Sequence, residues 1–349
     1  MKTTYRAMQT RGSGLLELVE RPVPEPAEGQ VLIAVEACGI CGADVHDVEG
    51  AVAPNAPPRV PGHEVVGRIA ALGPGNPPLW QVGQRVGVGR LGGHCNACPQ
   101  CRQGQFPLCL QQPIVGSGCD GGYAEMMIAR GTGLIAIPQE LSSEEAAPIL
   151  CAGIATFNAL RRSGAQAGDL VAVLGIGGLG HMALQYAQRM GFRVAAIGRG
   201  ADVAQDARAL GAHLFIDTDR EDVAARLGAL GGAQAVVATI GHGELLATLV
   251  NALSPRGRLI VLGGGRDPLS VSLGALVRGE RSVQGSITGS PFECERALDF
   301  SLLTGVRPLI ETMPLEQAQD AYRRMKSGQA RYRMVLTMDA RSPGARPGG

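Results

Sequence analysis

A glycine-rich turn between two short apolar runs constrains the fold of this chain more than any other feature of its sequence. Residues 170–174 (LVAVL) are apolar, residues 175–180 read GIGGLG, and a helical pattern and a second apolar run at 192–197 follow. This order predicts a strand–turn–helix–strand unit that binds a dinucleotide pyrophosphate at the helix N-terminus. A tight turn without a ligand is the alternative. The predicted cofactor-binding residues of the turn are Gly175, Gly177, Gly178, Leu179 and Gly180.

Helices and strands continue to alternate beyond this unit. Strands separated by helices are typical of a parallel sheet that is covered by helices on both faces. Residues 153–287 are therefore predicted to form a doubly wound α/β domain. Its further predicted helices cover residues 202–210, 221–230 and 243–253, and its further predicted strands cover residues 213–216, 234–239 and 257–262.

The end of the second predicted strand distinguishes NAD from NADP. A carboxylate at this point would bind the ribose 2′-hydroxyl of NAD, whereas an arginine would accept the 2′-phosphate of NADP. The sequence has Gly198 where the acid is expected, and Arg199 follows it. Asp202 could supply the missing acid, but it is expected to cap the next helix. The pattern favours NADP(H).

Four of the nine cysteines lie close together, in the spacing C-x2-C-x2-C-x7-C. Glycine, proline and glutamine surround them, so they are expected on a loop, where four thiolates can hold a structural zinc ion. An iron–sulfur cluster, a redox pair or four reduced thiols are the alternatives. The predicted ligands are Cys95, Cys98, Cys101 and Cys109.

A second group of metal-binding residue types is scattered along the chain. Cys41, His63, Glu64 and Cys151 are the set that a catalytic zinc ion requires if folding brings them together. Their spacing alone does not decide the matter, because a lone cysteine is more often a small buried apolar residue.

The charge balance and the hydropathy of the sequence argue against several classes of partner and location. Lysine and arginine number 32 and aspartate and glutamate 31, a net charge of +1, which favours neither nucleic acid nor an anionic membrane as a partner. The sequence lacks an apolar run long enough to span a membrane, and its N-terminus lacks the apolar core of a secretory signal. A cytoplasmic protein that acts on a small molecule is expected.

Several motifs together resemble the zinc-dependent alcohol dehydrogenases of the medium-chain dehydrogenase/reductase superfamily. They are CGICGADVH, PGHEVVG, the four-cysteine segment, CAG at 151–153 and LGIGGLG at 174–180. The resemblance implies a mostly β, GroES-like catalytic domain at residues 1–152 and 288–349, with a structural zinc lobe at about 92–112. A Rossmann domain at 153–287 is inserted into it. The resemblance also implies two zinc ions per chain and a homodimer or homotetramer joined through the edge of the Rossmann sheet.

The resemblance also implies roles for single residues. Catalytic zinc would be held by Cys41, His63 and Cys151, and Glu64 would approach the metal during ligand exchange. Asp44 would support the ligands, His46 would end a proton relay to solvent, and Arg333 would contact the cofactor pyrophosphate. Leu91 and Cys119 would line the substrate pocket. Arg90, beside Leu91, could meet an anionic substrate, but a solvated surface arginine is the stronger expectation.

Three positions depart from the family pattern. Ala43 replaces the Ser or Thr that passes the substrate proton towards His46, and alanine cannot hydrogen-bond. Ala155 replaces a Thr beside the nicotinamide, with Thr156 shifted by one, and Pro291 replaces an arginine. We expect a zinc- and NADPH-dependent oxidoreductase of an alcohol–carbonyl pair. The alternatives are an iminium or enone reductase, which needs no such relay, and a catalytically silent relative.

Overall fold

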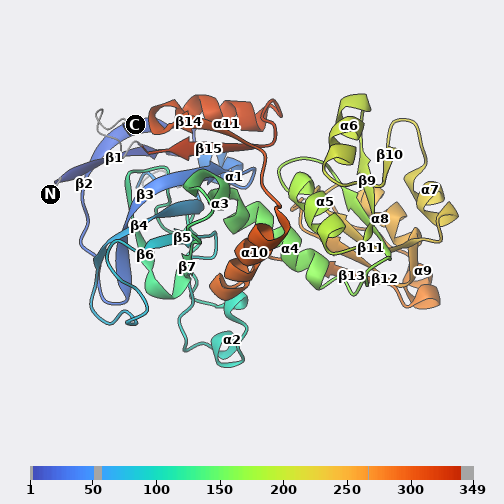
Figure 1. The fold of residues 1–349 in the computed structure, drawn as a ribbon, viewed down its shortest axis with the longest axis horizontal. Helices are drawn as coiled ribbons and strands as arrows, with labels where there is room; N and C mark the ends of the chain where they lie inside the picture. The colour runs from blue at the N-terminus through green and yellow to red at the C-terminus, as the bar shows by residue number, and fades with distance from the viewer. Residues whose placement is uncertain (1–2, 51–56, 266, 339–349) are drawn as a thin grey trace, which may run out of the picture. The chain divides into compact units, whose positions relative to one another are not determined.

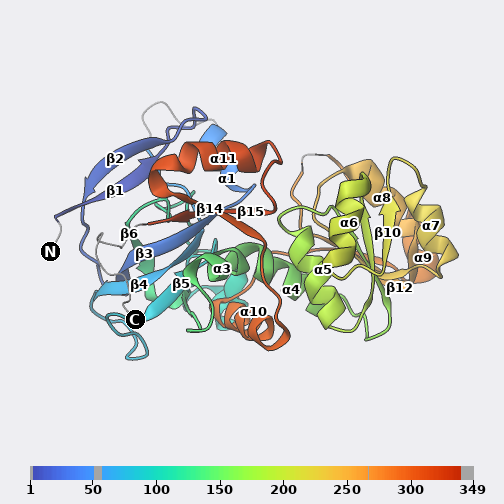
Figure 2. The ribbon, with the colours of Figure 1, turned by 45° about the horizontal axis from the view of Figure 1, so that its top comes forward.

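The computed structural model describes residues 3–50, 57–265 and 267–338 and divides into two compact units (Figures 1 and 2). The first unit comprises Met1–Cys151, Gly289–Leu302 and Pro308–Gly349, and the second comprises Ala152–Thr288 and Leu303–Arg307. Each main boundary lies within one residue of the predicted one. The short segment Leu303–Arg307, predicted for the catalytic domain, groups with the second unit.

The first unit is built on a mostly antiparallel sheet. Its central strand β3 (Gln30–Ile40) pairs with β15, β4 and β6, and the hydrogen-bonded path runs β14-β15-β3-β4-β5-β7. β1 (Thr4–Gln9) and β2 (Glu17–Pro22) form a separate hairpin. Buried Val31, Ile33 and Val35 alternate along β3, so one face of the sheet packs on the core. The other strands are β4 (Glu64–Leu72), β5 (Arg85–Val88), β6 (Met126–Arg130), β7 (Leu134–Ala136), β14 (Ile310–Pro314) and β15 (Arg333–Thr337).

Short helices connect and cover these strands. A capping box at Ser142 and Glu145 starts α3 (Ser143–Pro148), because each side chain accepts a hydrogen bond from the backbone of the other residue. Pro148 has no N–H to donate, and the π-helical turn Ile149–Gly153 follows it directly. The other helices here are α1 (Asp44–Glu49), α2 (Pro99–Arg102), α11 (Ala318–Lys326) and most of α10 (Pro291–Thr304).

The second unit contains the predicted six-stranded parallel sheet, in the order β10-β9-β8-β11-β12-β13. From β8 the chain continues to β9 and β10 on one side of the sheet, and from β11 it continues to β12 and β13 on the other side. Since crossovers between parallel strands are right-handed, α5 and α8 lie on opposite faces (Figure 1). The strands are β8 (Leu170–Leu174), β9 (Arg193–Gly198), β10 (Leu214–Asp217), β11 (Ala233–Ala238), β12 (Leu253–Val261) and β13 (Ser282–Gly285). The helices are α4 (Ile154–Arg161), α5 (Gly180–Arg189), α6 (Ala201–Ala209), α7 (Val223–Ala229), α8 (Gly243–Asn251) and α9 (Leu273–Gly279).

The combination of a GroES-like sheet unit with a doubly wound parallel-sheet unit confirms the predicted fold class. Predicted element positions in the second unit agree with the structure to within about two residues, except that β12 begins four residues before the predicted start at 257. Among the described residues, no helix combines the length and apolar character needed to cross a membrane.

Candidate active site

Folding brings Cys41, His63, Glu64 and Cys151 into one cluster in the first unit. One ligand atom from each lies within 4.8 Å of the others. The Cys41 and Cys151 sulfurs are 3.8 Å apart, and Cys151 Sγ lies 3.5 Å from His63 Nε2. Tetrahedral zinc with ordinary bond lengths requires about 3.8 Å between two sulfurs and about 3.5 Å between sulfur and nitrogen. The donor set and its spacing therefore fit a zinc ion.

Sheet pairing explains how residues so far apart in sequence meet. Gly39 near the end of β3 pairs with Glu64 at the start of β4, so Cys41 and His63 lie beside each other. A side chain at position 39 would place its Cβ 1.9 Å from Glu64 Oε2, so only glycine leaves room for the carboxylate. Cys151 enters from the π turn, a feature that is frequent at functional sites.

Buried Asp44 holds His63 and the Cys41 backbone in place. Its Oδ1 lies 2.8 Å from His63 Nδ1, while its Oδ2 accepts hydrogen bonds from Cys41 N–H at 2.9 Å and from the Tyr123 hydroxyl at 2.7 Å. A carboxylate on Nδ1 directs the Nε2 lone pair of His63 towards a metal. Asp44 thus lies behind the cluster, where the resemblance places it. The sequence analysis missed Tyr123, since only the fold brings it to Asp44.

Glu64 and Arg333 form a buried ion pair beside the cluster. Arg333 Nη2 donates to Glu64 Oε1, and the other oxygen, Oε2, has no hydrogen-bond partner among the described residues. Burial raises the pKa of Glu64 to about 7, although the Arg333 charge opposes the shift. The unpartnered oxygen is the kind of group that can approach a metal. The structure thus places Arg333 on Glu64, and its contact with the cofactor pyrophosphate stays a prediction.

The pKa values of the two thiols in the cluster, Cys41 and Cys151, are shifted in opposite directions. The hydrogen bond from Cys151 lowers the pKa of Cys41 well below its ordinary value, and the same contact raises the pKa of Cys151. A thiolate at Cys41 and a thiol at Cys151 are therefore favoured without metal. Since zinc ligands must be thiolates, metal binding would release a proton.

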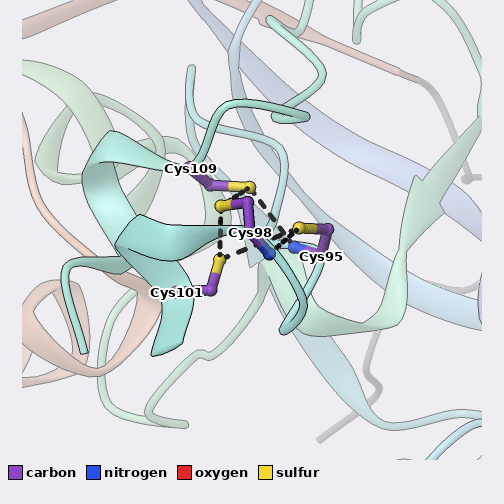
Figure 3. A group of neighbouring side chains, drawn as sticks. All are labelled: Cys95, Cys98, Cys101 and Cys109. Atoms are coloured by element: carbon purple, nitrogen blue, oxygen red, sulfur yellow. Dashed lines mark hydrogen bonds between the residues drawn. The ribbon is translucent and has the colours of Figure 1, made fainter. Parts of the chain in front are cut away.

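The second cluster is the four-cysteine lobe (Figure 3). Cys98 Sγ lies 3.5 Å from Cys101 Sγ and 3.9 Å from Cys109 Sγ, and the Cys95 and Cys101 sulfurs are 3.9 Å apart. These separations again bracket the value of about 3.8 Å that tetrahedral zinc requires. Backbone N–H groups of Cys101 and Leu110 lower the pKa of Cys98 to about 6. The predicted loop also contains a short helix, α2, which begins directly after Cys98.

The glycine turn borders a cavity of about 720 Å³ in the second unit. Gly175 has φ of +87°, and a Cβ at Gly180 would lie 1.9 Å from Gly175 O, so both positions require glycine. A Cβ at Gly177 would meet nothing within 4 Å, which leaves its backbone open to a ligand. The turn leads into the N-terminus of α5. The cavity therefore fits a dinucleotide pyrophosphate. Gly175, Gly177, Gly178 and Leu179 all line it.

Gly198 and Arg199 also line this cavity, and their contact with the cofactor stays a prediction. Thr218 and Asp219, which follow β10, line it as well. No motif in the sequence pointed to Thr218 and Asp219, because they follow a different strand from the glycine turn. The expected capping role of Asp202 was wrong. Gly200, with φ of +89°, stands at the N-cap of α6, and the exposed Asp202 side chain lies in the first turn without capping it.

The predicted relay and pocket residues have different surroundings. Ala43 precedes α1, and His46 is exposed on that helix. Thr156 cannot replace the hydroxyl missing at 155, because its Oγ1 donates to Ala152 O at 2.7 Å within its own helix. Leu91 is buried. Cys119 borders a separate cavity of about 630 Å³ whose walls contain none of the four clustered ligands.

Comparisons with known proteins show the family to which the chain belongs. Residues 27–139 match the alcohol dehydrogenase GroES-like domain, and residues 178–302 match the zinc-binding dehydrogenase family. The chain is 40% identical to an alcohol dehydrogenase of Aspergillus sp. (strain MF297-2), over 93% of this chain and 95% of that protein. It is 37% identical to an alcohol dehydrogenase of Geobacillus stearothermophilus, over 93% and 96% of the two chains.

Solved structures of similar proteins include complexes with either nicotinamide cofactor. One is an acetophenone reductase from Geotrichum candidum in complex with NAD, with a TM-score of 0.84, 26% identity and coverage of 97% of this chain and 98% of that one. Another is the CAD of Helicobacter pylori complexed with NADP(H), with a TM-score of 0.84, 26% identity and coverage of 98% and 100%. The cysteine–histidine cluster, the four-cysteine lobe and the glycine turn thus occur together in a chain that belongs to the zinc-type alcohol dehydrogenases of the medium-chain dehydrogenase/reductase superfamily, and that is an oxidoreductase.

Proposed function

We propose that this oxidoreductase transfers hydride between NADP(H) and an alcohol–aldehyde or alcohol–ketone pair, with one catalytic and one structural zinc ion per chain. The observation that carries the proposal is the tetrahedral spacing of Cys41, His63 and Cys151 around one point. Three protein ligands leave a fourth position for a substrate oxygen, as in catalytic rather than structural zinc sites. The four-cysteine lobe supplies a complete structural set.

Each residue of the cluster has a defined task in this mechanism. Zinc, when bound, supplies a Lewis acid that stabilises negative charge on the substrate oxygen. Cys41, His63 and Cys151 hold the metal, and Asp44 fixes the orientation of the His63 ring. All three ligands are buried, so bulk water is kept from the reacting centre. Glu64 stands next to the metal position with one unpartnered oxygen.

Steady-state assays with a substrate panel test this proposal. Oxidation of NADPH with aldehydes and ketones is the expected result. An iminium or enone reductase is the second candidate, because Ala43 lacks the relay hydroxyl and such a reaction needs no relay to a bound alkoxide. Turnover of an imine or enone without turnover of any aldehyde would establish that candidate. An absence of turnover throughout the panel would indicate a silent relative.

The missing relay hydroxyl gives a direct prediction. Ala43→Thr should raise the rate of alcohol oxidation near neutral pH by at least about tenfold, since positioned proton transfer contributes about 10²–10⁴ in rate. The pH profile of kcat for a primary alcohol measures the effect. Ala43→Val, which has the same shape without the hydroxyl, is the matched control. An equal rate in both variants would mean that no relay passes through this position.

Arg199 should determine the choice of cofactor. Arg199→Gln should raise the Kd for NADPH by about tenfold to a hundredfold and leave that for NADH within about twofold, because only NADPH carries the 2′-phosphate. Fluorescence titration with each cofactor measures both constants. Exposed Arg189 on α5, changed to Gln, is the control. An equal rise in Kd for both cofactors would contradict a contact between Arg199 and the 2′-phosphate. Asp219 would then be the candidate partner of a ribose hydroxyl.

We also propose that copies of the chain associate through the edge of the parallel sheet. β13 is the last strand of that sheet, and neighbouring α9 exposes Leu273 and Val277, each at 78%. Exposed apolar side chains beside an unpaired strand are typical of an interface. Sedimentation of the wild type and of Val277→Asp tests this, with a shift towards monomer expected for the variant.

A further inference from the structure

Three polar side chains form a further cluster in the first unit, on segments that adjoin those of the metal ligands, and none of them has a role in the mechanism above. Asp47 lies on α1, Arg90 follows β5, and Ser117 lies between β5 and β6. The Ser117 hydroxyl donates to Asp47 Oδ1 at 2.6 Å, and Arg90 Nη2 donates to Ser117 Oγ at 3.5 Å. We refer to Asp47, Arg90 and Ser117 as the polar triad.

Two atoms of the polar triad are buried without a hydrogen-bond partner among the described residues. They are Asp47 Oδ2 and Arg90 Nη1, which lie 3.9 Å apart, too far for a hydrogen bond. The Asp47 side chain is only 7% exposed and that of Arg90 27%, so Arg90 is half-buried and less solvated than expected. Buried polar atoms in proteins are normally hydrogen-bonded, which makes these two candidates for binding a ligand.

The three segments that carry the polar triad also pack on the segments that carry the metal ligands. Asp47 lies one turn after Asp44 on α1. Gly116, before Ser117, packs so closely on the residue before His63 that its Cβ would lie 3.0 Å from Gly62 N. Gly89, before Arg90, approaches the residue before Cys151, with its Cβ position 2.9 Å from Leu150 O. The polar triad is therefore connected to the metal cluster through helix α1 and through two close backbone approaches.

We propose that the polar triad binds a neutral hydroxyl group on the substrate, away from its reacting carbon. A hydroxyl can donate to Asp47 Oδ2 and accept from Arg90 Nη1 at the same time, and so satisfies both unpartnered atoms. A carboxylate could only accept, and it would meet the Asp47 charge, which already balances that of Arg90. The proposal rests on the proposed function, because it assigns specificity to the same site.

Matched substrates test the recognition of the hydroxyl. The panel comprises benzaldehydes with a hydroxymethyl, an ethyl or a carboxylate substituent at the same ring position. The wild type should show a kcat/KM about tenfold to a hundredfold higher for the hydroxymethyl than for the ethyl compound, the range expected of hydrogen bonds to charged groups. Arg90→Gln should reduce this preference to about threefold or less, while exposed Arg296→Gln should retain it.

Removal of the Asp47 charge gives the sharper test. Asp47→Asn leaves Arg90 without its balancing carboxylate, so turnover of the carboxylate compound should rise relative to that of the ethyl compound. If the polar triad only stabilised the fold, Asp47→Asn would instead lower kcat/KM for all three substrates by the same factor. That result would overturn the proposal. So would a wild type that reduces the ethyl and hydroxymethyl compounds equally well.

Equilibrium binding separates this proposal from the proposed function. The corresponding benzamides, which carry the same substituents but do not react, are titrated calorimetrically into the zinc-loaded enzyme. Tighter binding of the hydroxymethyl amide in the wild type but not in Arg90→Gln supports the polar triad, even if no aldehyde is reduced and the proposed function fails. Aldehyde reduction together with equal binding of the amides overturns the polar triad and leaves the proposed function intact.

Discussion

Replacement of Cys151 by serine should remove one of two zinc equivalents and lower kcat/KM by at least about a thousandfold. The reason is that Cys151 is one of the three protein ligands in the proposed site, and its sulfur lies 3.8 Å from the Cys41 sulfur and 3.5 Å from His63 Nε2, the separations expected around one zinc ion. Loss of a Lewis acid removes several kcal/mol of transition-state stabilisation, and each 1.4 kcal/mol is about tenfold in rate. Atomic absorption of the dialysed protein and steady-state kinetics measure the two effects.

Cys294→Ala is the matched control for this variant. Cys294 is also a buried thiol of the first unit, on α10, but it lies in neither metal cluster. It should keep both zinc equivalents and most of the activity, with a loss of stability of about 1 kcal/mol from the missing sulfur. Full zinc content in Cys151→Ser would contradict the catalytic site as assigned.

Replacement of Cys101 by serine should remove the other zinc equivalent and open the lobe to proteolysis. The lobe has a very small apolar cluster of its own, which in the part of the chain that the structure describes consists of the three buried cysteines together with Cys95 and Phe106. Structural zinc in small peptide domains contributes about 10–16 kcal/mol of apparent binding free energy, so little else would hold the lobe together. Tryptic cleavage after Arg102 should accelerate at least about tenfold.

Exposed Gln103 in the same lobe provides the control for this experiment. Gln103→Ser should keep both zinc equivalents and the resistance to trypsin of the wild type. Chelation of the wild-type protein should reproduce the cleavage pattern of Cys101→Ser. If the variant retained two zinc equivalents, or if its lobe resisted trypsin as the wild type does, zinc would not be what holds these four cysteines.

The features that could be predicted from the sequence depend mainly on neighbours along the chain. Gly175, with its positive φ, and Gly180, whose Cβ would meet Gly175 O, are required by geometry within the turn itself, so the motif is visible without the fold. The four lobe cysteines could also be recognised from the sequence, because they lie within one short segment. Cys41, His63 and Cys151 are different, because only the resemblance to a family suggested that they meet.

The role of Arg333 and the surroundings of Ala43 show where the sequence was insufficient. A pattern can place Arg333 at the start of a strand, but its pairing with Glu64 depends on β15 lying next to β3 and β3 next to β4. Likewise, Thr156 has a hydroxyl one position from the expected one, and only the helix geometry shows that this hydroxyl is already bound to Ala152 O.

Periodicity and close spacing in the sequence determined the doubly wound fold of the second unit, the glycine turn and the lobe cysteines, because these are local properties of the chain, whereas the first unit was expected only from the family resemblance. The tertiary structure decided the rest of the site. It brought Tyr123 to Asp44, Arg333 to Glu64, and Arg90 to within 3.9 Å of Asp47. The physical reason is that these contacts are set by strand pairing and close packing between distant segments, which determine the geometry and electrostatics of the site and leave no regular spacing in the sequence.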